Sequence, residues 1–153
     1  MLKTTEPSSS LSSAELFCVA PHLIDSYWPH VVTLVRNAVL RGRGDYTVEY
    51  VYKRLKKNQA LLWLVVKDGA IKAAGTTEIN SMLDGPQRVC VITTFAGNNI
   101  ADYDYLMDDI EHYAISEQCS LIRVYGREGW SRYLRNRGYK QPWIALEKRL
   151  GSE

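Results

Sequence analysis

The sequence predicts a single α/β domain built on a mixed sheet with helices on both faces, and three observations support this. The chain has 153 residues, of which 46% are hydrophobic and 24% charged, as in ordinary globular domains. Stretches with the 3.6-residue period of an amphipathic helix alternate with short apolar stretches of strand length. Two of the short stretches flank an Asp-Gly dipeptide, which favours a tight hairpin turn. The predicted element order is β-α-α-β-β-β-α-β-α-β.

Residues 1–15 are predicted to be a flexible tail ahead of a domain that covers residues 16–153. The tail has few apolar side chains, so burial cannot offset the entropy of ordering it. It contains no apolar run of the kind a signal peptide needs, and the apolar run at 60–66 is only long enough for a strand. The serines of the tail are Ser8, Ser9, Ser10, Ser12 and Ser13.

The cysteines predict a reducing compartment. Cys18, Cys90 and Cys119 are odd in number, have no Cys-x-x-Cys spacing, and each lies in an apolar stretch. Small buried thiols explain them better than disulfides. We therefore expect a cytoplasmic protein without structural disulfides.

The first third predicts a short strand and two helices. Residues 17–20 are apolar and end at Pro21, after which apolar residues recur every three or four positions as far as Val39. Gly42 and Gly44 end that helix. Thr47 is a suitable N-cap for the second helix, because its hydroxyl can accept a hydrogen bond from a free backbone N–H.

The rest of the chain predicts the sheet and its covering helices. Asp68-Gly69 joins two strands into a hairpin, and a right-handed crossover joins the strand before the long helix to the strand after it. In chain order the elements are strands at 61–67, 71–79 and 87–95, a helix at 102–118, a strand at 121–125, a helix at 128–136 and a strand at 143–150.

A resemblance to a known family rests on this element order and on the segment Tyr125-Gly-Arg-Glu-Gly-Trp-Ser-Arg-Tyr-Leu134 followed by Gly138-Tyr139. Over residues 16–150 the chain resembles the GNAT superfamily of acyl-CoA-dependent N-acyltransferases, and the segment looks like that of small GNAT-like proteins encoded by tailed bacteriophages. The resemblance implies an enzyme that moves an acyl group from acetyl-CoA to an amine, in the host cytoplasm or in a virion if phage-encoded.

The resemblance also implies a cofactor loop at the start of the long helix. In the family this loop reads Q/R-x-x-G-x-G/A, and its backbone amides hold the CoA pyrophosphate. Aligning Leu106-Met107 with the paired leucines of the family puts Asn99 and Ala101 at the two small positions. The loop lacks a basic residue, and Asp102 and Asp104 follow it, so cations would have to come from elsewhere. The implied cofactor-binding residues are Phe95, Asn98, Asn99, Ile100, Ala101, Arg127 and Arg132.

The implied reaction needs a general base for the amine and a general acid for the departing thiolate. Glu78 is the carboxylate inside the central strands and is the predicted base; the alternative is a polar residue on a solvated strand face. Family members often place a Tyr four residues before the Gly of the Gly-aromatic step. Here Leu134 holds that position, and the predicted acid, Tyr133, is displaced by about 100° around a helix.

Three other interpretations stay open. The altered loop and the shifted tyrosine also fit a catalytically degenerate GNAT-fold module, phage-encoded, that contacts proteins or a phage assembly. The scattered His22, His30 and His112 do not predict a metal site. A basic, aromatic C-terminal third could contact nucleic acid, although we favour a complement to the acidic helix. Its cations are Arg123, Arg127, Arg132, Arg135, Arg137, Lys140, Lys148 and Arg149.

Overall fold

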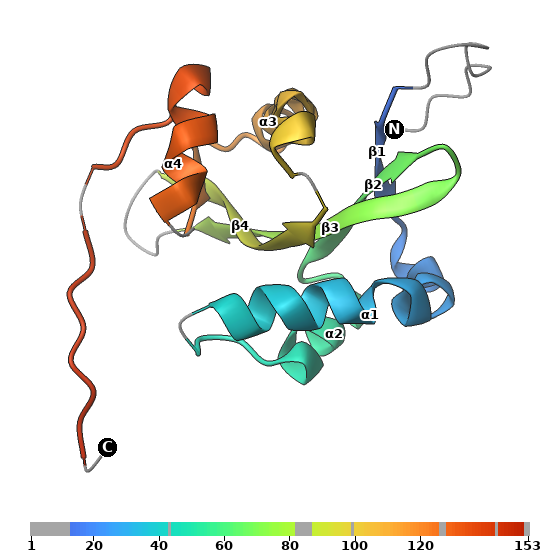
Figure 1. Cartoon of the computed structure of the whole chain (residues 1–153), viewed down its shortest axis with the longest axis horizontal. Coiled ribbons are helices and arrows are strands. Elements are labelled where there is room, and N and C mark those ends of the chain that lie inside the picture. Colours follow the sequence, from blue (N-terminus) through green and yellow to red (C-terminus); the bar gives the residue numbers. More distant parts are fainter. Residues whose placement is uncertain are drawn as a thin grey trace.

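The computed structural model describes residues 13–42, 44–81, 87–98, 100–125, 128–142 and 144–151. One sheet separates two pairs of helices, so the α/β class is confirmed (Figure 1). In chain order the elements are β1 (Glu15–Val19), α1 (Ile24–Arg41), α2 (Val48–Lys56), β2 (Leu61–Lys67), β3 (Ala70–Ser81), β4 (Arg88–Gly97), α3 (Met107–Ser116), β5 (Leu121–Val124) and α4 (Glu128–Leu134), with 3-10 helices at Pro21–Leu23, Ile100–Leu106 and Arg135–Arg137.

The described strands form one sheet in the order β1-β2-β3-β4-β5. Neighbours are antiparallel except β4 and β5, which are parallel, as the predicted crossover requires. Asp68 and Gly69 have φ values of 54° and 76°, the left-handed conformation of a two-residue hairpin turn. The backbone N–H of Tyr50 donates to the Thr47 hydroxyl at 3.0 Å, so the predicted N-cap is confirmed.

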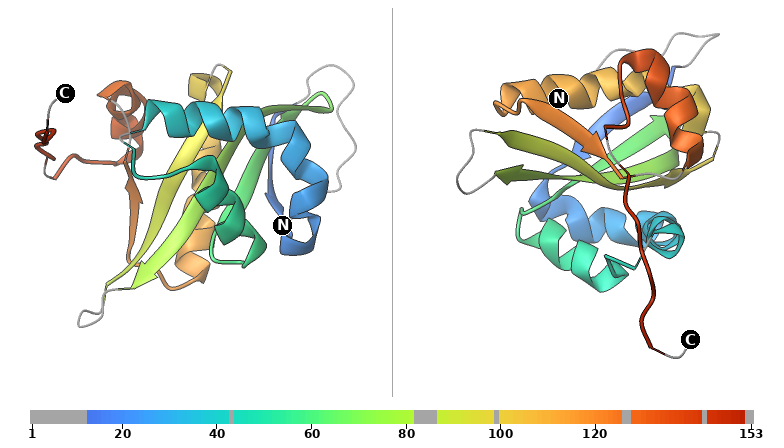
Figure 2. Two further views of the ribbon diagram at one scale, coloured as in Figure 1. Left: turned by 90° about the horizontal axis from the view of Figure 1, so that it is seen from below. Right: turned by 90° about the vertical axis from the view of Figure 1, so that its left-hand side faces the viewer.

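Two helices cover each face of the sheet (Figures 1 and 2). Because successive strand residues point to opposite faces, Leu62 and Leu64 of β2 pack with α1 and α2, while Trp63 packs with α3 and α4. Among the described residues no helix is long and apolar enough to cross a membrane.

The predicted start of the long helix differs from the observed one. Residues Ile100–Leu106 form a 3-10 helix, and the α-helix begins only at Met107. Asp and Tyr alternate over residues 102–105, and neither is a strong helix former. The regular helix therefore begins where the buried apolar positions Met107, Ile110 and Ala114 begin.

The last predicted strand is also different. Residues 144–150 lie in neither a helix nor a strand, and Trp143 lies outside the described residues. A strand needs a partner for its hydrogen bonds, and no described strand lies beside this segment. At the other end, β1 begins at Glu15, the last residue of the predicted tail, and residues 1–12 lie outside the described residues.

Cys18, Cys90 and Cys119 are free. Burial, with a smaller contribution from Cys119, raises the pKa of Cys90 to about 12. The Cys90 thiol therefore stays protonated at neutral pH and behaves as a small apolar side chain.

Tyr113 makes the stability of the fold dependent on pH. Its ring packs edge-on against Trp63 with 5.3 Å between centroids. Burial, followed by the charge of Glu117, raises the pKa of Tyr113 to about 12. The folded protein thus keeps a proton that the unfolded chain loses near pH 10. This contribution is fully present below about pH 10 and is lost as the pH rises toward 12.

We therefore expect the free energy of unfolding to fall less steeply above about pH 10 in Tyr113→Phe than in the wild type. Tyr139 keeps part of the slope in both proteins, because burial and its hydrogen bond to Glu111 raise its pKa as well. Urea unfolding at a series of alkaline pH values measures the slopes, with Tyr27→Phe as an exposed control. Equal slopes in Tyr113→Phe and the wild type would contradict the assignment.

Candidate functional site

The candidate site lies where β4 and β5 separate. β5 pairs with β4 only as far as Ile92 opposite Val124, whereas β4 continues to Gly97 and stays paired with β3 to its end. Residues 93–97 of β4 therefore present one edge without a β5 partner. Backbone groups on such an edge can bond to an extended ligand that contains amides.

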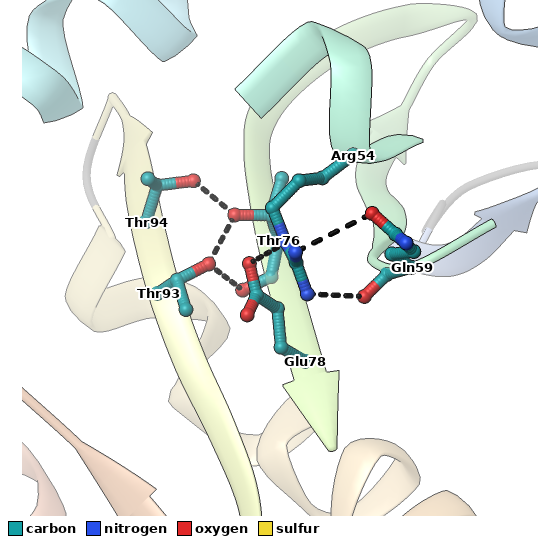
Figure 3. A network of polar contacts seen from close by, with 6 residues as sticks. All are labelled: Arg54, Gln59, Thr76, Glu78, Thr93 and Thr94. Atoms are coloured by element: carbon teal, nitrogen blue, oxygen red, sulfur yellow. Dashed lines mark hydrogen bonds and ion pairs between the residues drawn. The ribbon is translucent and has the colours of Figure 1, made fainter. Parts of the chain in front are cut away.

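A β-bulge explains the separation. Thr76 pairs with Thr94 and Thr77 with Ile92, so Thr93 is an extra residue in β4. The Thr76 hydroxyl lies 2.6 Å from the hydroxyls of both Thr93 and Thr94 (Figure 3). Thr93 and Thr94 are adjacent in β4, yet both side chains reach the Thr76 hydroxyl, because the bulge interrupts the alternation of side chains between the two faces of the strand. A bulge bends its strand, and this one follows the last pair with β5.

An open cleft of about 80 Å³ occupies this separation. Its walls combine one cation, three hydroxyls and three aromatic rings, so it suits a ligand with both amide and apolar parts. The residues that provide these groups are Arg41 of α1, Thr93, Thr94 and Phe95 of β4, and Tyr125 and Trp130 after β5, with Ala38 of α1 beside them.

Phe95 and Trp130 form a wall shared with a second, apolar cavity. Their ring centroids are 5.6 Å apart and the rings are nearly perpendicular. Both residues also line a cavity of about 20 Å³ on the α3 and α4 side of the sheet. Phe95, a predicted cofactor-binding residue, thus borders the cleft on one side and the helix-covered core on the other.

Glu78, the predicted base, lies on the same face of β3 as Thr76, one strand repeat away from the threonine cluster (Figure 3). It does not line the cleft. Its Oε2 accepts a hydrogen bond from Nε of Arg54 at 2.8 Å, and the side chains are 11% and 27% exposed. Arg54 also donates to the carbonyl oxygen of Gln59 at 3.3 Å. Glu78 is therefore part of an ion pair between β3 and α2.

Tyr46 packs against the core on the α1 and α2 face of the sheet. Burial, followed by the negative charge of Glu78, raises the pKa of Tyr46. The Tyr46 phenol on the α1–α2 connection therefore stays protonated at neutral pH.

Tyr133, the predicted acid, lies on the other side of the sheet. It is 38% exposed and lines the apolar cavity, not the cleft. Leu134 is buried in the same cavity wall. The structure therefore does not bring Glu78 and Tyr133 together, and Tyr125 is the tyrosine that lines the cleft among the described residues.

The predicted cofactor loop is described in part. Asn98 is exposed, but its backbone N–H already donates to the carbonyl of Lys72 at 3.1 Å. Ile100 and Ala101 open the 3-10 helix, and Asp102 stands in its first turn. Asn99 lies outside the described residues. Gly97 is needed for packing, because a Cβ there would lie 2.4 Å from that of Ala73.

The basic residues differ in their surroundings. Arg132 is exposed on α4, and Arg127 lies outside the described residues. Arg137 donates to Asp108 of α3 at 2.6 Å, which agrees with an internal complement to the acidic helix. Arg41 was not singled out by the sequence, although it is the guanidinium on the cleft wall among the described residues.

The sequence also missed the role of three small or polar residues in the strands. Thr93 and Thr94 interrupt an otherwise apolar strand, which was the available signal for the bulge. The third residue is Gly75, where a Cβ would lie 2.7 Å from Cδ2 of Phe95 and 2.9 Å from the carbonyl oxygen of Thr94. An isolated glycine inside a strand indicates such a close approach.

Comparison with solved structures finds the same fold in several acetyltransferases. The chain is similar to a predicted acetyltransferase from Clostridium acetobutylicum solved with acetyl-CoA (TM-score 0.65, 11% identity, 88% of this chain and 96% of that one). It is also similar to glucosamine-6-phosphate N-acetyltransferase from Arabidopsis thaliana (0.63, 12%, 92% and 100%) and to a GNAT family acetyltransferase from Staphylococcus aureus (0.62, 16%, 90% and 99%).

No family model and no curated protein sequence matches the chain. At these identities the likeness shows the fold: this protein has the GNAT acetyltransferase fold.

Proposed function

We propose that this protein is an N-acyltransferase that transfers an acyl group from acyl-CoA to an amine. The observation that carries the proposal is the cleft beside the Thr93 bulge, where the β4 edge has no β5 partner. When bound, the thioester supplies an activated acyl group. The free edge of β4 would bond to the amides of the pantetheine arm, and Phe95 and Trp130 would pack against its apolar parts.

The phosphates of acyl-CoA need cations, because Asp102 stands in the first turn of the 3-10 helix. Arg41 on the cleft wall and exposed Arg132 on α4 are the described residues that we assign to this role. Arg127, Asn99 and the backbone of Ile100 and Ala101 remain proposed contacts of the same part. The chain thus fits the pantetheine arm better than the pyrophosphate.

The base step is assigned to Glu78 and the acid step to one of two tyrosines. Glu78 is proposed to take the proton of the amine, which requires that its ion pair with Arg54 opens or rearranges. The thiolate needs a phenol, and two are proposed: Tyr133 from the family resemblance, and Tyr125 from its place on the cleft wall. Comparing Tyr125→Phe with Tyr133→Phe in thiol release decides between them.

Calorimetric titration with acetyl-CoA tests the proposal. Ala38→Trp, on the cleft wall, is expected to weaken binding at least about tenfold by filling the space. Leu40→Trp, two residues along the same helix and 73% exposed, should leave binding unchanged. If wild-type protein gives neither heat nor a thermal shift with millimolar acetyl-CoA, the enzyme proposal fails. The degenerate, phage-encoded interaction module would then be the better explanation.

A further inference from the structure

We propose that the Thr94 hydroxyl is a further contact of the acceptor amine: its oxygen accepts a hydrogen bond from an N–H of the amine, and Thr76 and Thr93 hold it in that orientation. This inference rests on the proposed acyl transfer and adds the group that orients the nucleophile. It follows from the way three threonine hydroxyls of β3 and β4 bond to one another (Figure 3).

Only one arrangement of the three hydroxyl hydrogens satisfies every contact of this cluster. The Thr93 hydroxyl lies 3.2 Å from the backbone carbonyl oxygen of Thr76, and a carbonyl only accepts, so the Thr93 hydrogen is used there. Thr76 is then the donor in its 2.6 Å contact with Thr93. Thr94 is in turn the donor in its 2.6 Å contact with Thr76. The donors thus run from Thr94 to Thr76, then to Thr93 and to the carbonyl.

This arrangement makes Thr94 an acceptor toward the cleft. Its single hydrogen is committed to Thr76, and it receives neither of the other two hydrogens of the cluster, so its oxygen keeps its lone pairs for a ligand. Thr94 lines the cleft and is 7% exposed, whereas Thr76 is 1% exposed and does not line it. A ligand group that bonds to the Thr94 oxygen must therefore bring its own hydrogen.

The face of the sheet favours the amine as that donor. Ala74 of β3 packs with α1 and α2, so Thr76 and Glu78, which follow at steps of two, lie on the same face. Thr94 meets Thr76 on this face. Because Glu78 is the proposed base, the amine that gives up a proton to it approaches from this side. The thioester carbonyl does not suit Thr94, since its oxygen only accepts.

The hydroxyl chain orients the amine and does not carry its proton. The chain ends at the Thr76 carbonyl oxygen, which has no proton to pass on to a further group. In the reaction the amine nitrogen bonds to the thioester carbonyl carbon, the C–S bond breaks, the thiolate takes up a proton, and the nitrogen loses one N–H proton to the base. A neutral primary amine has a second N–H that stays in the amide product, and this is the hydrogen that Thr94 holds.

Thiol release from acetyl-CoA with methylamine and with dimethylamine tests the proposal. The two probes are small and similarly basic, but neutral dimethylamine has a single N–H, which the reaction consumes, so none is left for Thr94. The quantity compared is the ratio of the two rate enhancements over the reaction in buffer. Thr94→Val should lower the methylamine-to-dimethylamine ratio about fivefold, as expected for the loss of one hydrogen bond, and Thr94→Ser should keep it.

Two buried threonines of β3 supply a second variant and its matched control. Thr76→Val leaves Thr94 in place but removes the acceptor of its hydrogen, so the ratio should fall here as well. Thr77→Val also removes a buried hydroxyl from β3, but this hydroxyl accepts from Nε1 of Trp63 at 2.9 Å, on the α3 and α4 face. Thr77→Val should therefore keep the wild-type ratio, and circular dichroism checks that each variant is folded.

Calorimetry with acetyl-CoA separates failure of this inference from failure of the proposed function. Thr94→Val should bind acetyl-CoA as the wild type does; weaker binding would assign the N–H to the cofactor and overturn the proposal. A wild-type ratio in both Thr94→Val and Thr76→Val overturns it, as does acetyl-CoA binding without acceleration of either amine. If the wild type does not bind acetyl-CoA, the proposed function itself fails, and this inference fails with it.

Discussion

Replacing Gly75 by valine is expected to destabilise the protein by about 3 kcal/mol, at the upper end of the usual cost of overpacking, and to weaken acetyl-CoA binding at the same time. Gly75 lies between Trp63 of β2 and Phe95 of β4 in the sheet register. A new Cβ would meet the Phe95 ring at 2.7 Å and the backbone of Thr94 at 2.9 Å. The ring must then move away from Gly75, which changes the cleft wall that it forms with Trp130.

Urea unfolding and calorimetric titration measure the two effects of Gly75→Val. Ala70→Val is the matched control: it adds the same side chain to an exposed position of the same strand, where the change should stay within about 0.5 kcal/mol. Combining Gly75→Val with Phe95→Ala should cost less than the sum of the two single changes, because the clash with the ring is removed. Wild-type stability and affinity in Gly75→Val would show that Phe95 does not lie over this glycine.

Arg54→Ala is expected to lower the free energy of unfolding by about 2 kcal/mol, because it leaves the largely buried carboxylate of Glu78 without its partner. The same change also removes the contact of Arg54 with the Gln59 carbonyl and its position over the Tyr50 ring, 5.5 Å from the centroid. Loss of this anchor should loosen α2 from the sheet beside the cleft.

Lys53→Ala on the same helix is the control for Arg54→Ala. The ion pair of Lys53 with Glu49 spans 3.7 Å between side chains that are 63% and 77% exposed, so its loss should cost at most about 0.5 kcal/mol. The pair Arg54→Met and Glu78→Leu should be less destabilising together than the sum of the single changes. Equal costs for Arg54→Ala and Lys53→Ala would argue against a structural role for the ion pair.

Local sequence patterns predicted most of the fold. Asp68-Gly69 and Thr47 act through their own backbone neighbours, so their roles can be recognised without tertiary contacts. The parallel pairing of β4 and β5 follows from the crossover that any such pair requires. The predicted start of the long helix was wrong. The Asp-Tyr repeat over residues 102–105 weakens the helix locally, and periodicity alone does not register this.

The candidate site could be predicted only in part. The family resemblance pointed to Phe95, which lies on the cleft wall, and to Glu78, which lies one strand repeat from the threonine cluster. It could not show that Arg54, 24 residues away in sequence, binds Glu78, or that Tyr133 faces a different cavity from Tyr125. These facts depend on which face of the sheet each residue occupies.

By itself, the sequence determined the α/β class, the hairpin, the helix cap and the order of elements through α4, because these follow from periodicity and turn chemistry within short segments. The tertiary structure decided the bulge at Thr93, the cleft beside it, the close approach of Phe95 to Gly75, and the projection of residues 144–150. Each of these depends on how segments far apart in the chain pack together. Such contacts are set by packing of the whole sheet and leave little signal in any one segment.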